Sequence, residues 1–362
     1  MKPKYILFIL CISLLGYSCI TKYEAKGIDK VGDILVVDGI ITDDETIIML
    51  SRSVNLTDED FGYYYFVDNA EVYVECDDGT RWQAEPYYDY WISRNGRYII
   101  KTGKLNLACQ YRLKIEIGEL EYSSDYSHPI ETPEIDSIFY VKRGKGQPIM
   151  MYVDTHSPKN ENLYYRWSYR EDWEVNAEVY VNGYPYNCWN SSRSMDVLLG
   201  SGEKTVYGQL ADILTEISPS DRRLSALYRI IVKQNSISKR SHDYYANIKK
   251  NSQQSGSIFA PVPSELRGNI TCTTDPEKPV IGYVDVSTTT KKQRLISRAD
   301  MLFENPLRCM ILDREYVLAM NGGRIPDNYV PYGSGSYVER ICVDCTLLGG
   351  FLQKPDEWPP DN

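Results

Sequence analysis

Short runs of alternating apolar and polar residues constrain the fold of this chain more than any other feature. From Asp33 onward five runs follow one another, ILVVDGIIT, TIIMLSRSV, AEVYVECDDGTRW, GRYIIKTG and YRLKIEIGELEYSS, separated by turns rich in Asp, Asn and Gly. In the third run Val72 and Val74 point to one face and Tyr73 to the other, and DDGT is a hairpin signal. Strands at this spacing predict a β-sandwich of about a hundred residues, placed at 32–131.

A second β pattern begins at Ile135, after the proline-stiffened linker HPIETPEIDS. SIFYVKR and PIMMYVDT precede NLYYRWSYREDWEV, in which Tyr165, Trp167 and Tyr169 share one face. That alternation is typical of the central strand of a sandwich. The chain is therefore predicted to be all-β, with two β-sandwich-like domains, and the second domain (134–362) is the larger.

The apolar period changes within the second domain. One apolar group has helical spacing, and a second segment is predicted to be a helix that Ser241 caps. A strand-like run, LYRIIVKQNSIS, lies between them. We therefore predict a helical insertion at about 208–255, and a Gly- and Pro-rich tail after Asn321 that disulfides pin. The helical positions are Leu210, Ile213, Leu214 and Ile217, then Tyr244, Tyr245 and Ile248.

The N-terminus has the pattern of an export signal. A basic start, MKPK, precedes the apolar run Tyr5–Leu15, which matches a signal-peptide core and is too short to span a bilayer. GYSC then resembles a bacterial lipobox, in which the cysteine is acylated and becomes the first mature residue. We predict a lipoprotein signal peptide at 1–18, lipidation of Cys19 and a tether at 19–31; the alternative is an ordinary secretory signal cut nearby.

Acylation would make the membrane a partner of the protein. Each buried methylene contributes about 0.8 kcal/mol, so several chains on Cys19 hold a protein at a bilayer. Ile20 stands where an Asp would favour inner-membrane retention in enteric bacteria, so the outer membrane is the expected location. The sequence leaves open whether the protein faces the periplasm or the cell surface.

The mature chain is acidic. Without the two lysines of the signal, 38 basic residues face 50 acidic ones, a balance of −12. Nucleic acid requires clustered Lys and Arg, so it is not an expected partner. The short basic stretch at Lys291, Lys292 and Arg294 is interpreted as a solvated strand face.

The cysteines of an exported chain meet an oxidising compartment. Leaving out Cys11 in the signal and the anchor, seven cysteines remain, so at least one is unpaired. Cys76 and Cys109 lie in separate runs of one domain, where a bridge across a sheet is feasible. Cys342 and Cys345 have CxxC spacing, but no second CxxC is present, which favours disulfide bonding over zinc or thiol redox chemistry. The connectivity cannot be read from the sequence.

The sequence carries none of the common motifs for catalysis, metals or cofactors. The sequence contains no HExxH, GxSxG or GxGxxG, so an enzyme is not expected. His128, His156 and His242 are scattered, and each is interpreted as a surface or capping residue, so neither a metal nor a cofactor is predicted. The paired carboxylates of TDDE and TDEDFG are interpreted as solvated loops.

Tyrosine stands out in the composition, with 31 Tyr against 7 Phe. Tyr combines an apolar face with a hydroxyl that stays wet, and loop aromatics can stack on sugars or anchor a protein. The alternative is that these side chains merely cover half-buried strands. The candidate binding aromatics are Tyr63, Tyr64, Tyr65 and Phe66 in one loop and Tyr87, Tyr88, Tyr90 and Trp91 in another.

Two resemblances add to these predictions. DNAEVYVECDDGT, NGRYII and QYRLKIEIGELEY resemble carboxypeptidase-regulatory or transthyretin-like sandwiches. YYRWSYREDWE, YRIIVKQNSISKRSHDYYANIKK, VIGYVDVST, CVDCTLLGG and KPDEW, with the lipobox, resemble a domain-of-unknown-function family of Bacteroidetes outer-membrane lipoproteins. Cys272 is extra to that family's pattern and is the candidate unpaired thiol. The candidate disulfide cysteines are then Cys76, Cys109, Cys188, Cys309, Cys342 and Cys345.

The resemblance implies a functional setting. Genes of that family often lie beside TonB-dependent receptors, and the family brings no established catalytic residues. The function hypothesis is a non-enzymatic accessory or ligand-capture subunit of a TonB-dependent nutrient uptake system, with the receptor β-barrel as partner and the ligand unknown. The alternatives are a structural or adhesive surface protein and an unrecognised hydrolase.

Overall fold

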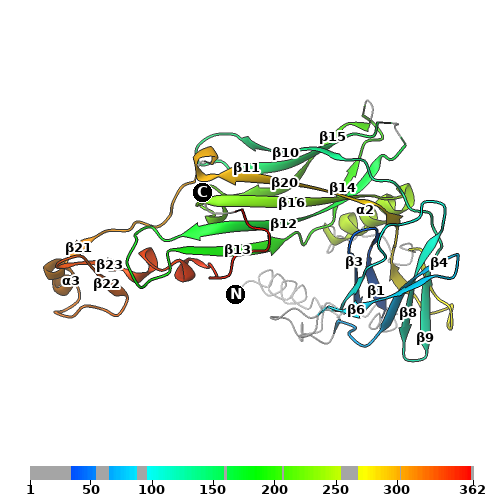
Figure 1. The fold of residues 1–362 in the computed structure, drawn as a ribbon, viewed down its shortest axis with the longest axis horizontal. Helices are drawn as coiled ribbons and strands as arrows, with labels where there is room; N and C mark the ends of the chain where they lie inside the picture. The colour runs from blue at the N-terminus through cyan, green and yellow to red at the C-terminus, as the bar shows by residue number, and fades with distance from the viewer. Residues whose placement is uncertain are drawn as a thin grey trace, which may run out of the picture.

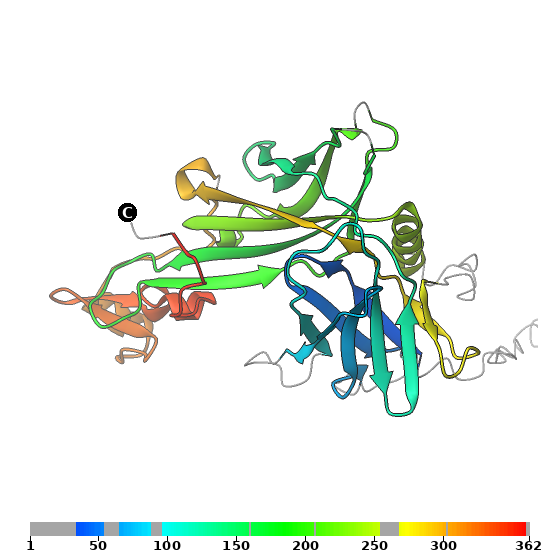
Figure 2. The same cartoon turned by 45° about the vertical axis from the view of Figure 1, so that its right-hand side comes forward.

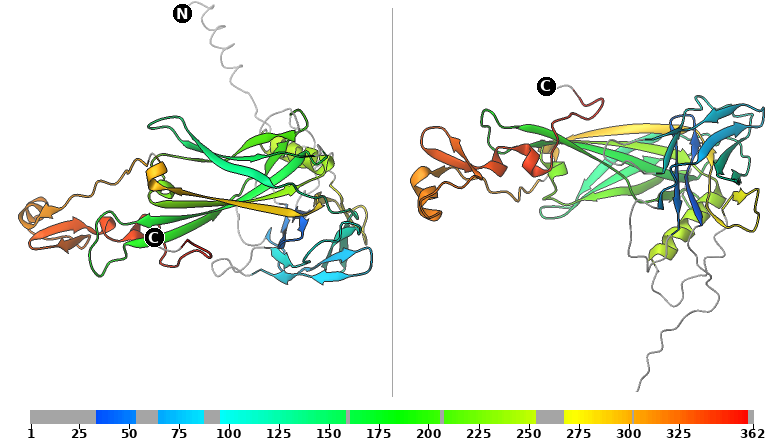
Figure 3. Two further views of the ribbon diagram at one scale, coloured as in Figure 1. Left: turned by 45° about the horizontal axis from the view of Figure 1, so that its top comes forward. Right: turned by 90° about the horizontal axis from the view of Figure 1, so that it is seen from below.

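The computed structural model describes residues 34–53, 65–87, 96–158, 161–205, 208–253, 268–301 and 303–359. These residues form several β-sheets and two α-helices, so the all-β, sandwich-like prediction is confirmed. The molecule is elongated, with an N-terminal sandwich at one end, a longer sandwich in the middle and a small lobe at the other end (Figures 1 and 3). No helix among the described residues is both long and apolar enough to cross a membrane.

The first sandwich contains two five-stranded sheets, ordered β18-β1-β3-β7-β6 and β17-β9-β8-β4-β5, with a short β19-β2 pair beside them. Alternate residues of β1 and β3 are buried, as the sequence pattern predicts for one core face. The strands are β1 (Leu35–Gly39), β2 (Ile41–Thr42), β3 (Thr46–Arg52), β4 (Glu71–Cys76), β5 (Arg81–Gln83), β6 (Glu85–Pro86), β7 (Arg97–Ile100), β8 (Tyr111–Ile117), β9 (Leu120–Ser124), β17 (Ile270–Cys272), β18 (Val280–Gly282) and β19 (Val286–Ser287).

Three strands of the first sandwich come from a distant part of the chain. β18 pairs in parallel with β1, joining Leu35 to Val280, and β17 extends the other sheet along β9. Ile270 and Val286 belong to the same hydrophobic core. Figure 2 shows the segment after residue 268, in yellow, beside the strands of the first sandwich. The expected boundary is therefore corrected: this strand segment was assigned to the second domain, yet it completes the first. A parallel edge pairing between distant segments has no local sequence signal.

The second sandwich packs the sheet β10-β11-β15 against the sheet β13-β12-β16-β20, in which β14 also pairs with β12. β12 is a central strand, and its Tyr165 and Trp167 are buried in the core between the sheets, as predicted. The elements are β10 (Ile135–Lys142), β11 (Ile149–Thr155), β12 (Tyr164–Asn176), β13 (Asn187–Arg193), β14 (Leu198–Ser201), β15 (Leu210–Ile217), β16 (Leu227–Ser236), β20 (Thr289–Ser297), α2 (Lys239–Gln253) and the 3-10 turns η3 (Arg222–Leu224) and η5 (Arg298–Asp300).

The predicted helical insertion is half correct. α2 exists and carries the expected tyrosines, but it begins before Ser241, and the Ser238 hydroxyl accepts the backbone N–H of Ser241 at 3.1 Å. The segment with helical spacing at Leu210 is the strand β15. A register shift against β11 at Leu214 inserts an extra residue, so Leu214 and Ile217 are both buried although they are three positions apart. The β-bulge therefore explains why the apolar residues of this strand have helical spacing.

The small lobe, called the distal lobe below, follows the second sandwich. Its elements are β21 (Leu312–Asp313), α3 (Arg314–Met320), β22 (Tyr329–Tyr332), β23 (Ser336–Glu339), η6 (Arg340–Cys342) and η7 (Cys345–Leu348). Cys309–Cys342 closes the lobe on itself, and Cys188–Cys345 ties it to β13. The expectation that disulfides pin the Gly- and Pro-rich tail is confirmed.

Candidate functional site

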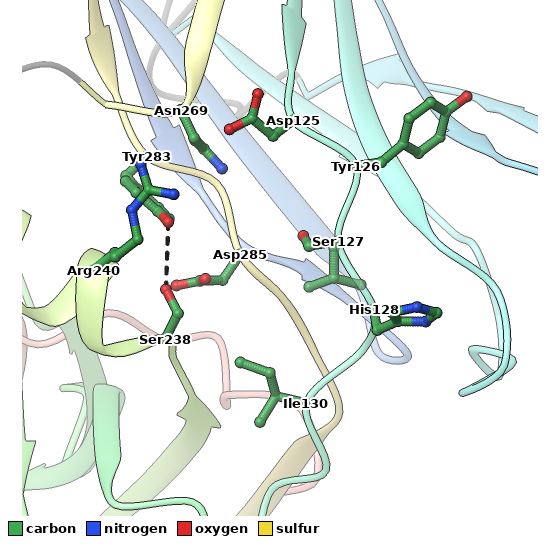
Figure 4. A pocket seen from close by; sticks show the side chains of 11 residues that line it. Asp125, Tyr126, Ser127, His128, Ile130, Ser238, Arg240, Asn269, Tyr283 and Asp285 are labelled. Carbon is green, nitrogen blue, oxygen red and sulfur yellow. Dashed lines mark hydrogen bonds between the residues drawn. The ribbon is translucent and has the colours of Figure 1, made fainter.

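A cavity of ≈170 Å³ lies where the first sandwich meets the start of α2. Its walls come from the chain after β9, from the first residues of α2 and from the segment between β18 and β19 (Figure 4). The polar side chains nearest its centre are Asp125, Ser127, Ser238, Arg240, Asn269 and Asp285, whereas Tyr126 and His128 turn away from Asp285.

Asp285 is the most unusual group in this cavity. It is only 5% exposed, and its Oδ2 has no hydrogen-bond partner among the described residues. Burial raises the pKa of its carboxyl, although the hydroxyls of Ser241 and Ser238 act in the opposite direction. A carboxylate beside the first turn of α2 also complements the helix dipole. Asp285 is therefore a buried carboxyl at the junction of the first sandwich with α2.

Beside the cavity, a partly exposed ion pair joins the two sandwiches. Arg166 on β12 donates to both carboxylate oxygens of Asp38 on β1, at 2.9 and 3.0 Å. Burial would raise the pKa of Asp38, but the Arg166 charge and hydrogen bonds outweigh it and lower that pKa. The Tyr245 hydroxyl donates to the Tyr283 carbonyl at 2.8 Å, and Arg166 stacks on the Tyr245 ring.

A second ionic contact crosses the same junction and corrects the interpretation of one acidic loop. Asp44, from the TDDE stretch, accepts hydrogen bonds from Lys233 at 2.9 Å and lies 2.6 Å from Lys291. Lys292 donates to the carbonyls of Ile135 and Asp136. Lys291, Lys292 and Arg294 are exposed, as expected for a solvated strand face. The acidic loop was also interpreted as solvated, but its Asp44 binds Lys233 and Lys291 because the sandwiches meet there.

Asp44→Asn is expected to remove a pH-dependent part of the stability. Burial opposes ionisation of Asp44, yet hydrogen bonds from Lys291 and Lys233 lower its pKa from 3.8 to about 2. The ionised group therefore stabilises the fold above pH 3.8, and this contribution disappears as the pH falls through about 2. After allowance for solvent screening we expect a loss of about 1 kcal/mol near pH 5.

Urea unfolding midpoints of Asp44→Asn and the wild type, measured at several pH values, test this expectation. The difference should shrink steadily as the pH approaches 2. Glu45→Gln, an exposed carboxyl next along the chain, is the matched control and should leave the midpoint unchanged. A difference between Asp44→Asn and the wild type that stays constant with pH would contradict the proposed role of the ion pair.

A second, open hollow of ≈480 Å³ is lined by Asp136, His156, Pro158 and Gln209. His156 Nδ1 lies 2.7 Å from Asp136 Oδ2, and both side chains are partly exposed. The other histidines have different neighbours: His128 contacts Gln110 and the Cys109 carbonyl, and His242 lies against Tyr164. The described part of the chain therefore places the three histidines in separate environments.

The predicted aromatic loops are only partly within the described residues. Tyr65 and Tyr87 are half-buried and Phe66 is exposed, with Phe66 forming an isolated β-bridge to Ser51. These three residues do not establish a binding face. The remaining candidates, Tyr63, Tyr64, Tyr88, Tyr90 and Trp91, and the predicted lipidation site Cys19, lie outside the described residues.

The cysteines divide into two groups. Cys188, Cys309, Cys342 and Cys345 form disulfides, as expected. Cys76, Cys109 and Cys272 are free thiols, so the expected bonding of the first two is not present in this structure, whereas Cys272 was predicted to be unpaired. The Sγ atoms of Cys76 and Cys109 and a carboxylate oxygen of Asp77 nevertheless lie within 4.8 Å of one another.

The distal lobe exposes four large apolar side chains, Met310, Ile311, Tyr316 and Met320, called the distal apolar surface below, which sequence reasoning missed. Met310 and Ile311 precede β21, and Tyr316 and Met320 are four positions apart on α3. Met310 is 62% exposed and Met320 66%. The signal was present in RCMILDREYVLAM, which carries more apolar residues than a helix of two turns can bury; of α3 only Val317 is buried.

A comparison with protein families gives one result. A family model described as "Domain of unknown function (DUF4249)" matches residues 20–293. The match ends within β20, so the distal lobe lies beyond it. No curated protein matches the chain.

Proposed function

The chain belongs to the family described as a domain of unknown function (DUF4249), and because membership supplies no activity, we propose the function from the resemblance to outer-membrane lipoproteins encoded beside TonB-dependent receptors, together with the chain's own features. It is a non-catalytic accessory subunit, anchored by lipid on Cys19 to the outer membrane of a Bacteroidetes cell, that docks on the β-barrel of a TonB-dependent transporter. The lipobox at the N-terminus supports the anchor.

The anchor also defines how such a subunit works. Residues 19–33 span at most about 50 Å when fully extended, so the folded body stays close to the bilayer. Confinement to a membrane raises the effective concentration of the protein near a barrel in the same membrane. A modest contact surface is then sufficient for docking.

The observation that carries the docking proposal is the distal apolar surface, Met310, Ile311, Tyr316 and Met320. Met and Tyr are enriched in the centres of protein interfaces, and the flexible Met side chain adapts to a partner's surface. Disulfides hold the lobe that carries these side chains, so binding does not require the lobe to become ordered.

Cavity size favours docking over nutrient capture by this subunit. Small-molecule sites usually enclose about 300–1,000 Å³. The junction cavity of ≈170 Å³ is smaller than that, and the larger hollow is an open depression lined by four residues. The transporter rather than this subunit is then the part that takes up the nutrient.

Met310→Glu combined with Met320→Glu is expected to abolish docking. A carboxylate buried in an interface without a partner costs more than 1.4 kcal/mol, so the two changes should reduce co-purification of the barrel at least tenfold. The measurement is quantitative mass spectrometry after gentle detergent extraction of natively expressed protein. Met195→Glu is the matched control, since Met195 is 91% exposed on the second sandwich.

Co-purification that is unchanged in the double variant, or lost equally in Met195→Glu, would contradict docking through the distal lobe. A wild-type protein that emerges from native membranes without a barrel would contradict the accessory role itself. If the double variant loses cell attachment while nutrient uptake is unchanged, the result would instead support the adhesive alternative. In that alternative the same apolar surface contacts host or matrix protein.

A further inference from the structure

Two free thiols face each other at one end of the first sandwich. Cys76 ends β4, and Cys109 lies in the turn before β8. Their sulfurs lie within 4.8 Å of one another, together with a carboxylate oxygen of Asp77. Cys76 is buried, whereas Cys109 is partly exposed. One sulfur of the pair is therefore accessible to a reagent and the other lies behind it.

The position of Cys109 follows from the pairing of the strands. Cys76 is the register partner of Tyr111, two residues after Cys109. The Tyr111 hydroxyl accepts the backbone N–H of Asn106 at 2.8 Å, and the Cys109 N–H donates to the Asn106 carbonyl at 3.1 Å. Two independent hydrogen bonds thus shape the turn that brings the sulfurs together.

The rest of the molecule indicates an oxidised state. Cys188–Cys345 and Cys309–Cys342 are both bonded, and such bonds form and persist where thiols are oxidised. The neighbouring thiols of Cys76 and Cys109 are exposed to the same oxidising conditions. We infer that Cys76 and Cys109 are a covalent modification site that closes into a third disulfide, independently of what the protein docks on.

The oxidant is the disulfide of a dithiol oxidoreductase, and the step is thiol–disulfide exchange. The accessible Cys109 thiolate attacks one donor sulfur, the donor S–S bond breaks, and its second sulfur leaves as a thiolate. Cys76 then attacks the Cys109 sulfur of the mixed disulfide and expels the donor. The donor gains two electrons and, from Cys76 and Cys109, two protons, and so becomes a dithiol.

Asp77 acts as the proton acceptor in the second step, the attack by Cys76. Burial raises the pKa of the Cys76 thiol to about 12, so its proton needs an acceptor as the sulfur attacks. The Cys76 Sγ already contacts Asp77 Oδ1 at 3.5 Å, and Asp77 is exposed. The carboxylate therefore receives the proton and passes it to water.

Zinc is the competing occupant of the same three groups. Structural zinc sites use four protein ligands, mostly thiolate or imidazole, and the described residues offer two sulfurs and one carboxylate here. The disulfide needs only the two sulfurs, so the geometry favours it over the metal.

The test uses full-length protein purified from native membranes without reductant. Free thiols are alkylated in denaturant, and trypsin is added. Cleavage after Arg52, Arg81, Lys104 and Arg112 places Cys76 and Cys109 on separate peptides. The expected result is one crosslinked peptide pair that separates on reduction, with Cys272 alkylated from the start.

Two variants serve as controls. Cys272→Ser should leave the crosslink intact, because Cys272 is buried on β17 with its sulfur 3.5 Å from the Thr274 hydroxyl. Cys109→Ser should abolish it and leave Cys76 alkylated. Alkylation of both Cys76 and Cys109 in the wild type would overturn the inference, and so would one equivalent of zinc in the purified protein that is lost in Cys109→Ser.

Discussion

Arg229→Met is expected to lower the free energy of unfolding of the second sandwich by about 3–5 kcal/mol. Arg229 lies on β16, is 1% exposed, and donates to Asp172 Oδ2 through Nε at 3.1 Å and Nη2 at 2.7 Å. It also donates to the carbonyls of Asp356 and Glu357 and stacks on Trp358. Methionine keeps the volume but leaves a fully buried carboxylate and two carbonyls without these donors.

Urea denaturation followed by tryptophan fluorescence checks this prediction. Arg170→Met is the matched control: Arg170 donates to the same Asp172 at 2.8 Å but is 31% exposed, so its loss should cost no more than about 1 kcal/mol. Arg229→Met combined with Asp172→Leu should recover most of the stability, because no buried charge remains. Equal losses in Arg229→Met and Arg170→Met would contradict the importance of burial.

Replacement of both Cys188 and Cys345 with alanine should cost about 3–5 kcal/mol. The bond closes a sequence separation of 157 residues, and both cysteines are fully buried between β13 and η7. Without it, the unfolded chain gains conformational entropy and the distal lobe loses its covalent link to the second sandwich. We expect faster trypsin cleavage within residues 303–350, together with a lower thermal midpoint.

The Cys309–Cys342 bond provides the comparison for this effect. It spans 33 residues, so loop-closure entropy predicts that removing it with two alanines costs about 1 kcal/mol less. Cys272→Ala controls for the loss of a cysteine without the loss of a bond. Unchanged proteolysis of the distal lobe in the Cys188/Cys345 variant would show that packing alone holds the lobe.

The parts of the fold that the sequence predicted are those determined by local pattern. β4 and β8 follow the alternation of their own residues, and in β12 the face with Tyr165 and Trp167 is buried. α2 follows a serine at its N-terminus and carries its tyrosines on the packed side. Each of these signals lies within about fifteen residues of the element it predicts.

The parts that were missed depend on distant partners. The pairing of Leu35 with Val280 joins residues that most of the second sandwich separates in the chain. The bulge at Leu214 depends on the neighbouring strand, and the KPDEW tail is held by Arg229 through backbone carbonyls, which any sequence would offer. The strand pairing and the attachment of the tail leave no periodic pattern in the sequence, and the bulge leaves a misleading one.

The candidate sites show the same division. The tyrosine-rich composition led us to predict binding by two aromatic loops. The residues of these loops that the structure describes, Tyr65, Phe66 and Tyr87, do not form a common binding surface. The junction contacts of Asp44 were missed because charges on a turn and on a remote strand face look solvated when each is considered alone. The exposure of Met310 could not be predicted, because it depends on the shortness of α3, which leaves the apolar residues beside it uncovered.

The return of residues 270–287 to the first sandwich has a consequence for biogenesis. Synthesis from the N-terminus delivers β1 long before β18, so until the later strand is made that sheet edge carries open backbone donors and acceptors. An open edge of this kind can pair with a second copy of the chain. A fragment that stops after β9 should therefore aggregate rather than behave as an autonomous domain.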